Sequence, residues 1–356
     1  MWSRSRIIWC GILTGLMFAL LHFLLMSTIR RRQDAYLIQK EQDALTSKVN
    51  EETRDLASLK ANKTDPKSAL HKAYGRVHTI LFFVGYPRSR HSLLGSLLDA
   101  HPHMVISDES MAFSRWKNRQ TTWISESISS FYDTISSASE RASTNGRTSF
   151  SSEGTVTNTS SAYGYHVPNQ WQGRYDEYIE VIGDKAGAFT ASALLSSNAV
   201  DAVHLLQKAS GAKVKFVHVV RNPFDNIATM VLRHKDIRER TGDHQQKVEA
   251  PEIMATKIRE YFHFAEGSQK ARSEFPSQVI DIPSKDFVQF PAETLRRVCD
   301  FLEIGCSERY IQECSSVVDT VPSKTRDFVE WSVENKMKVE NEMKRFPFLK
   351  DYSYND

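Results

Sequence analysis

The segment from His78 to Ser92 constrains the fold of this chain more than any other. It begins with the run HTILFFV, which shows no alternation of polar and apolar positions and ends at Gly85. Such a run predicts a strand that is buried on both faces of a parallel sheet. A short loop then leads into an expected helix, which directs backbone N–H groups and the helix N-terminus toward an anion. The segment therefore predicts an α/β fold with a phosphate-binding loop.

Strands and helices alternate along the rest of the chain. Further strands are expected at 104–106, 178–182, 214–220 and 278–282. Helices are expected at 92–98, 191–209, 226–240, 291–302 and 325–345. This alternation is typical of a mostly parallel sheet with helices on both faces, and ligands of such sheets bind beyond the carboxyl ends of the strands. We therefore expect a three-layer α/β/α domain over residues 76–356, similar to the P-loop NTPase fold.

The loop after the first strand only partly matches the nucleotide-binding pattern G-x-x-x-x-G-K-[ST]. Gly85 and Ser92 supply its first and last residues. Arg90 replaces the second glycine and His91 replaces the lysine. A nucleoside triphosphatase needs that lysine on the β- and γ-phosphates, together with a Mg²⁺ site. The loop thus predicts phosphate binding without triphosphate hydrolysis and disfavours a kinase.

A second candidate phosphate site follows the strand at 214–220. Arg221 stands at the end of that strand, Thr229 eight residues later and Arg233 twelve residues later. Thr229 and Arg233 are four residues apart on the expected helix and so share one face. An arginine with a hydroxyl group offers charge-assisted hydrogen bonds to a phosphate monoester.

Together these motifs resemble the PAPS-dependent sulfotransferases, in which PAPS is 3′-phosphoadenylyl sulfate. The resemblance is closest to the membrane-anchored Golgi types, including the tyrosylprotein sulfotransferases, which carry P-R-S-G-T-T-L followed by L-D-A-H-P. This chain has Pro87–Leu93 and Leu98–Pro102 at those positions, and the similarity extends in patches over residues 79–348. The resemblance implies PAPS as co-substrate and no metal. It implies that the donor is bound by Arg88, Ser89, Arg90, His91, Ser92, Arg221, Thr229, Arg233, Ser323, Lys324 and Arg326.

The resemblance also implies two catalytic residues. Glu109 aligns with the catalytic glutamate of the tyrosylprotein enzymes and would be the general base; the alternative is a solvated acidic pair with Asp108. Lys185 would stabilise the bridging oxygen as it acquires charge; the alternative is an ordinary surface lysine. Sulfuryl transfer needs a base and cationic groups but no metal. The chain has no H-E-x-x-H, C-x-x-C or D-x-D motif, and no third ligand joins His101 and His103.

Arg90 departs from the family pattern, since relatives usually have glycine there. If the position needs a positive φ, an arginine costs roughly 1–2 kcal/mol. The loop could still form, with Arg90 adding charge toward the ligand. A catalytically degenerate, nucleotide-binding lumenal protein is therefore the alternative from another functional class. A Golgi glycosyltransferase has the same membrane layout, but its metal-dependent members usually need the missing D-x-D motif.

The amino terminus carries an apolar run over residues 7–29, long enough to span a bilayer. No cleavage site follows it, so we expect an uncleaved signal anchor, with a buried core helix as the alternative. Flanking arginines nearly balance across the run, but sequons at Asn62 and Asn158 favour a lumenal carboxyl end. We therefore expect a cytoplasmic tail at 1–6 and a single-pass type II Golgi membrane protein.

Residues 30–75 are expected to form a helical stem. Interrupted heptads there favour either a homodimer through the stem or a partly helical spacer. A Ser/Thr-rich insertion is expected at 121–161, with helical spacing in its first part and an irregular loop after it.

Charge and cysteine content exclude other classes. Beyond residue 32 the chain has 41 basic and 43 acidic residues, so a large basic surface for nucleic acid is not expected. Four cysteines are too few for a disulfide scaffold. Cys306 and Cys314 are close enough to form a disulfide in the lumen, which leaves Cys299 as a buried thiol. The expected acceptor is a carbohydrate, with a protein tyrosine as the alternative.

Overall fold

The computed structural model describes residues 66–119, 127–147, 164–234 and 247–356. The chain divides into two units, residues 1–69 and 70–356, and the second contains the sheet and the candidate site. The expected cytoplasmic tail at 1–6, the membrane span at 7–29, most of the stem and both sequons lie outside the described residues, as do residues 121–126 and 148–161 of the Ser/Thr-rich insertion. Within the described ranges, no helix has both the length and the apolar character needed to cross a membrane.

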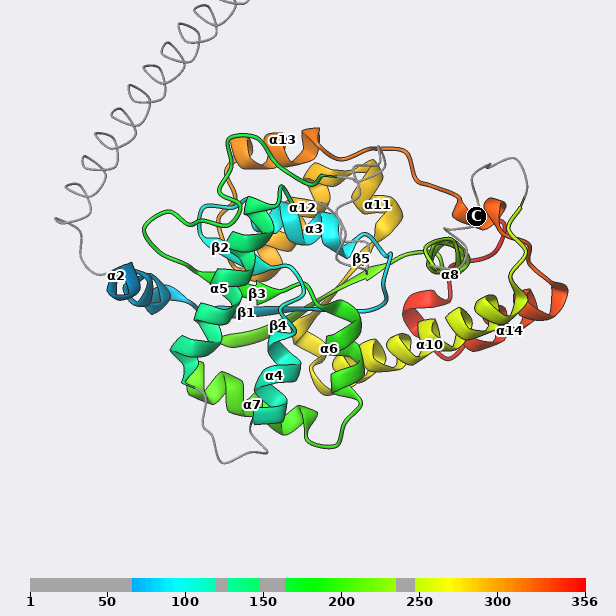
Figure 1. Cartoon of the computed structure of the whole chain (residues 1–356), viewed down its shortest axis with the longest axis horizontal. Helices are drawn as coiled ribbons and strands as arrows, with labels where there is room; N and C mark the ends of the chain where they lie inside the picture. The colour runs from blue at the N-terminus through cyan, green and yellow to red at the C-terminus, as the bar shows by residue number, and fades with distance from the viewer. Residues whose placement is uncertain (1–65, 120–126, 148–163, 235–246) are drawn as a thin grey trace, which may run out of the picture. The chain divides into compact units, whose positions relative to one another are not determined.

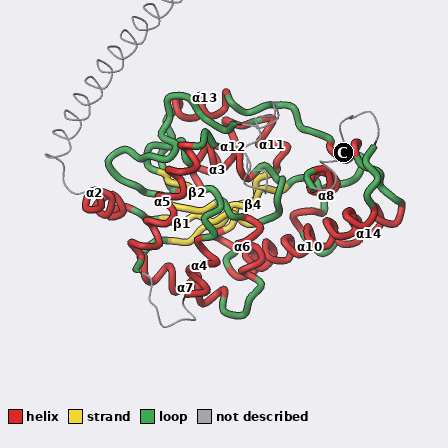
Figure 2. The backbone as a smooth tube through the Cα atoms, viewed as in Figure 1, coloured by secondary structure: helices red, strands yellow, loops and turns green. Residues whose placement is uncertain are grey.

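A five-stranded parallel sheet forms the centre of the second unit, in the order β2-β3-β1-β4-β5 (Figures 1 and 2). The strands are β1 (Thr79–Val84), β2 (Met104–Ser107), β3 (Val181–Asp184), β4 (Lys213–Val220) and β5 (Val279–Pro283). The middle strand β1 is buried along its whole length. The mostly parallel sheet predicted from the sequence is confirmed, because each expected strand overlaps an observed one.

Helices cover both faces of the sheet (Figure 1). Their bounds are α2 Pro66–Ala73, α3 His91–Leu98, α4 Ala112–Arg119, α5 Ile128–Thr144, α6 Gly187–Leu194, α7 Ala199–Ser210, α8 Pro223–Leu232, α10 Pro251–Glu274, α11 Ser284–Gln289, α12 Pro291–Leu302, α13 Glu308–Ser316 and α14 Val333–Met343. Short 3₁₀ turns lie at Tyr74–Arg76, Pro276–Gln278, Thr325–Phe328 (η3) and Pro347–Leu349.

Alternate side chains of β1 enter two separate hydrophobic cores. Ile80, Phe82 and Val84 pack with residues of α4, α5 and α7, whereas Leu81 and Phe83 pack with residues of α3, α12 and α13. Successive side chains of a strand point to opposite faces, so one strand serves both layers. A third core joins α8, α10 and α14 beside the sheet. These contacts give the three-layer arrangement its physical basis.

The structure corrects two of the longer helix predictions and adds a helix that was not predicted. The expected helix at 191–209 is two helices, α6 and α7, separated around Asn198, although Gly211 ends the second as expected, in the left-handed conformation. The expected helix at 325–345 is η3 followed by α14, whose first turn is capped by the Ser332 side chain accepting from the Asn335 N–H. The long helix α10 was not predicted at all, although Met254, Ile258 and Ala265 give it one buried face.

The disulfide pairing is also corrected: Cys299 is bonded to Cys306, and Cys314 is a free, buried thiol. Helix α12 ends at Leu302, and the next residue, Glu303, adopts a left-handed conformation and reverses the chain. This reversal brings the Cys306 Cα to 6.2 Å from that of Cys299. Cys314 points instead to the Leu97 carbonyl, and burial raises the pKa of its thiol to about 12.

Asp99, in the L-D-A-H-P segment, joins four parts of the fold. One carboxylate oxygen accepts from the Ile106 N–H and the Ser139 hydroxyl, each at 2.6 Å. The other accepts from the Gly173 N–H at 2.8 Å and from the guanidinium of Arg147. Asp99 and Arg147 are both buried, so the ion pair is shielded from water.

We expect Asp99→Ala to lower the free energy of unfolding by about 3–5 kcal/mol, because it leaves the buried Arg147 charge without its partner. Lys270→Ala is the matched control, since it breaks a more exposed helical pair with Glu274 and should cost less than about 1 kcal/mol. Urea unfolding followed by circular dichroism measures both. Equal losses in the two variants would contradict a structural role for the buried pair.

Candidate functional site

The candidate site lies at the carboxyl edge of the sheet. Because β3, β1 and β4 run parallel side by side, the segments that follow them leave the sheet at the same edge. Lys185 follows β3, the loop from Gly85 to Arg90 follows β1, and Arg221 follows β4. Residues 323–326 approach from the carboxyl-terminal part of the chain and contact Arg221.

The loop from residue 85 to 90 has an unusual backbone. Gly85 has a φ of 126°, and a Cβ atom there would lie 3.0 Å from the ring of His218, so glycine is required. Arg88 and Arg90 adopt left-handed conformations, with φ of 70° and 76°. Arg90 therefore occupies a position that needs a positive φ. It is also the N-cap of α3 and provides no capping side chain, which leaves the helix N-terminus suited to an anion.

His91 occupies the place of the missing lysine but does not supply charge. It is buried at the start of α3, and its Nδ1 lies 3.3 Å from the Ser89 hydroxyl oxygen. Burial, followed by the positive charge of Lys185, lowers the pKa of His91 to about 3. The imidazole is therefore neutral near pH 7. The neutral ring can donate or accept a hydrogen bond, but it cannot supply the positive charge that the lysine of a triphosphatase places on the phosphates.

Lys185 links the phosphate loop to two carboxylates. Its ammonium group lies 2.9 Å from the Ser92 hydroxyl, 3.0 Å from a Glu109 carboxylate oxygen and 2.5 Å from one of Asp108. Gly95 gives its side chain room, since a Cβ there would lie 2.9 Å from the Lys185 Cγ. Burial lowers the pKa of Lys185, but the two carboxylates outweigh burial and raise it. Lys185 is therefore a buried cation and not a surface lysine.

Asp184 positions the turn that carries Glu109. Its buried carboxylate accepts from the Ser107 hydroxyl at 2.8 Å and from the backbone N–H groups of Ser110 and Ala112 at 2.9 and 2.8 Å. These bonds hold Glu109 at a φ of 57°. Burial raises the pKa of Asp184, although the hydrogen bonds and Lys185 oppose the change. Our sequence reasoning missed Asp184; its signal was an acidic residue at the end of a buried strand.

Arg221 organises the second part of the site. One of its terminal nitrogens donates to the Thr229 hydroxyl at 2.9 Å and to the Arg88 carbonyl at 3.0 Å. The other donates to the hydroxyl groups of Ser323 and Thr325 at 3.1 and 2.9 Å. The structure thus joins the end of β4, helix α8, the phosphate loop and the 323–326 segment. Thr325 was not among the predicted residues, because a threonine in a basic run has no distinct signal.

Three other predicted residues have different surroundings. The guanidinium of Arg326 is buried and donates to both carboxylate oxygens of Asp225 and to carbonyl groups near the carboxyl end of the chain. Its contacts therefore hold the 323–326 segment against α8. Lys324 is exposed at the start of η3. Arg233 is half-buried at the end of α8, one turn beyond Thr229. A donor-binding role for these three residues stays a prediction.

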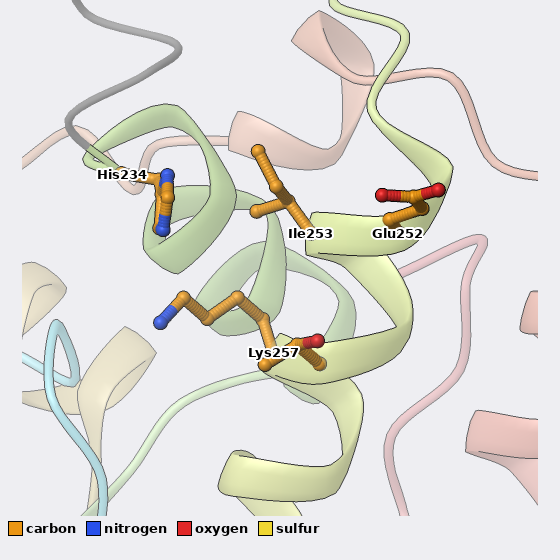
Figure 3. Close-up of a pocket in the computed structure, with 5 residues that line it drawn as sticks. His234, Glu252, Ile253 and Lys257 are labelled. Atoms are coloured by element: carbon orange, nitrogen blue, oxygen red, sulfur yellow. The ribbon is translucent and has the colours of Figure 1, made fainter.

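A small open hollow lies near the end of α8 and the first turns of α10 (Figure 3). It is lined by His234, Glu252, Ile253, Thr256 and Lys257. None of the predicted site residues contributes to this lining, so the hollow is distinct from the candidate site. The described ranges also contain no group of three or more His, Cys, Asp or Glu residues arranged to hold a metal ion.

Comparison with known proteins identifies a family. The sequence model that describes the sulfotransferase family matches residues 81–308 of this chain. A search of curated proteins finds no match. Among solved structures, the chain is similar to the sulfotransferase domain of the Synechococcus PCC 7002 olefin synthase, with 13% identity, coverage of 74% of this chain and 94% of that chain, and a TM-score of 0.40. It is also similar to sulfotransferase STF9 from Mycobacterium avium, with 11% identity, 81% and 80% coverage and a TM-score of 0.40. Mouse sulfotransferase SULT7A1, complexed with PAP, has 8% identity, 78% and 88% coverage and a TM-score of 0.37.

The neutral state of His91 makes the folded protein sensitive to acid. Its pKa is about 3 in place of 6.5, so between these values the unfolded chain binds a proton that the folded protein does not. The stability contributed by neutral His91 is complete above about pH 6.5 and is lost as the pH falls toward 3. When the pH is lowered from about 7 to about 5, the free energy of unfolding should fall by about 2 kcal/mol less in His91→Gln than in the wild type. Urea titrations at both pH values measure this difference, and parallel losses would contradict it.

Proposed function

Because this chain belongs to the sulfotransferase family, we propose that it transfers the sulfuryl group of PAPS to a hydroxyl or amine of an acceptor in the secretory pathway. One observation carries the proposal: Arg221, at the end of β4, donates a hydrogen bond to the carbonyl of Arg88 in the loop after β1. Two loops suited to anions therefore lie within one hydrogen bond of each other. A donor with phosphate groups at both its 5′ and 3′ positions could contact both loops at once.

The two loops would divide the donor between them. The 5′-phosphosulfate would lie at the N-terminus of α3, where Ser89, His91 and Ser92 offer hydrogen bonds and Arg88 offers charge. The 3′-phosphate would lie at Arg221 and Thr229, with Arg233, Ser323 and Lys324 around it. Arg221 is buried, and burial followed by the charge of Arg90 lowers its pKa to about 10, so it stays protonated near pH 7.

Glu109 and Lys185 would carry the chemistry. The acceptor oxygen attacks sulfur in line, the bond from sulfur to the bridging oxygen breaks, and 3′,5′-ADP leaves. Glu109 takes the acceptor proton, and Lys185 stabilises the charge on the leaving oxygen. In the free protein the two side chains form an ion pair at 3.0 Å. A phosphosulfate bound beside Ser92 would lie close to the Lys185 ammonium group and would compete with Glu109 for it. Glu109 would then be free to accept the proton of the acceptor.

The proposed acceptor is a carbohydrate, the acceptor of most lumenal sulfotransferases. The position of Glu109, two residues after the end of β2, favours a second candidate, a tyrosine of a secreted protein, because it matches the resemblance to the tyrosylprotein enzymes. Both acceptors present a hydroxyl group to the same base. A panel of glycans and tyrosine peptides with labelled PAPS distinguishes them.

We further propose that the protein is anchored in the Golgi membrane, with this domain in the lumen. The apolar run at 7–29 and the sequons at Asn62 and Asn158 support this placement. The disulfide between Cys299 and Cys306 is independent support, since disulfides persist in oxidising compartments and are rare in the cytosol. A homodimer through the stem is part of the same proposal.

The donor site is tested by calorimetric titration of 3′,5′-ADP into the full-length protein in detergent. We expect a dissociation constant on the order of micromolar for the wild type, and a loss of roughly a hundredfold in Arg221→Ala, because a buried charge-assisted contact to phosphate is removed. Lys270→Ala, on the exposed face of α10, should bind like the wild type. Absence of binding by the folded wild-type protein would refute the proposed donor site.

The base is tested by two neighbouring variants. Glu109→Ala should lower kcat by roughly a hundredfold or more without weakening the binding of 3′,5′-ADP, since a base acts on the acceptor proton and the loss of Glu109 only frees Lys185 for the nucleotide. Asp108→Asn is the matched control and should retain turnover within about tenfold, because Glu109 remains. Transfer of labelled sulfate to the acceptor panel measures both. If Asp108→Asn is inactive and Glu109→Ala is active, the assignment of the base is wrong.

A further inference from the structure

The side chain of Arg90 leaves the phosphate loop and reaches the second part of the site. Its two terminal nitrogens donate to the hydroxyl groups of Ser284, at the start of α11, and Ser323, each at 3.1 Å. Arg90 therefore contributes its backbone to the N-terminus of α3 and its charge to the surroundings of Arg221. A glycine, the usual residue at this position in the family it resembles, would contribute only the backbone.

Arg90 and Arg221 share one hydroxyl group. A terminal nitrogen of each lies 3.1 Å from the Ser323 side-chain oxygen. The two guanidinium groups are therefore within about two hydrogen-bond lengths of each other. Like charges this close repel, and an anion placed between them would remove the repulsion.

Neither of these arginines has an acidic partner in the described part of the chain. The buried arginines Arg147 and Arg326 each form an ion pair, with Asp99 and Asp225, whereas Arg90 and Arg221 form none within 4.0 Å among the residues that the structure describes. Burial lowers the pKa of both Arg90 and Arg221, and the charge of Arg90 lowers that of Arg221 further, although the carboxylate of Asp225 opposes both changes. Buried charges in proteins are normally paired, and Asp225 already pairs with Arg326, so the space between Arg90 and Arg221 is suited to an anion.

We propose that Arg90 is a ligand of the 3′-phosphate of the donor and sets the preference of the enzyme for 3′-phosphorylated nucleotides. The inference rests on the proposed donor site. Arg90 and Arg221 would hold the phosphate from two sides, where Ser323 now accepts from both. A dianion gains more from two guanidinium groups than from one, because each adds a charge-assisted hydrogen bond. This gain in binding is what offsets an arginine in a conformation that favours glycine.

The test compares 3′,5′-ADP with 5′-AMP, which differ only in the 3′-phosphate, by calorimetry on the full-length protein in detergent. Arg90→Gly should weaken 3′,5′-ADP binding by roughly tenfold or more and leave 5′-AMP binding within about twofold. Arg88→Gly, a matched change at the other left-handed position of the loop, should weaken both nucleotides. Arg90→Lys keeps the charge and should retain most of the preference.

The melting temperature of the free protein provides a second measurement. Arg90→Gly should raise it by roughly 2 °C, because the left-handed strain is relieved, which also shows that the variant is folded. If the wild type prefers 3′,5′-ADP and Arg90→Gly keeps that preference, this inference is overturned while the donor site stands. If the folded wild type binds neither nucleotide, the donor site and this inference both fail.

Discussion

The burial of β1 between two parallel neighbours is the constraint on which the rest of this structure depends. Its residues pair in register with β3 on one side, Phe82 opposite Asp184, and with β4 on the other, Val84 opposite His218. A shift of one residue would turn every side chain of the strand to the wrong core. The same register sets how far Lys185 and Arg221 extend beyond the sheet relative to the phosphate loop. The hydrophobic packing of the sheet therefore decides the geometry of a polar site.

The two parts of the site differ in their electrostatic balance. Lys185 already has carboxylate partners in the free protein, Glu109 and Asp108. Arg90 and Arg221 have hydroxyl and carbonyl partners only, among the contacts of the described residues. A dianion bound between Arg90 and Arg221 would thus neutralise their charges, and the other end of the donor would compete with Glu109 for Lys185. This difference connects occupancy of the donor site to release of the proposed base.

Backbone strain is concentrated near the same chemistry. Eight non-glycine residues in the described ranges have positive φ, and four of them, Arg88, Arg90, Glu109 and Met111, lie in the two loops of the site. Asp184 holds the turn of Glu109, and the Arg221 bond to the Arg88 carbonyl holds the phosphate loop. Such conformations persist only where the surrounding structure enforces them. The buried strands and their hydrogen bonds provide that enforcement.

The sequence by itself determined the strands, the parallel sheet and the order of the two phosphate motifs, because apolar runs and residue spacing are local properties. The tertiary structure decided which partners the long polar side chains find. It paired Cys299 with Cys306, because a left-handed turn reverses the chain after α12. It turned Arg326 toward Asp225 and brought Thr325 to Arg221, contacts between segments about a hundred residues apart. Such contacts depend on how the elements pack, and spacing along the chain does not encode them.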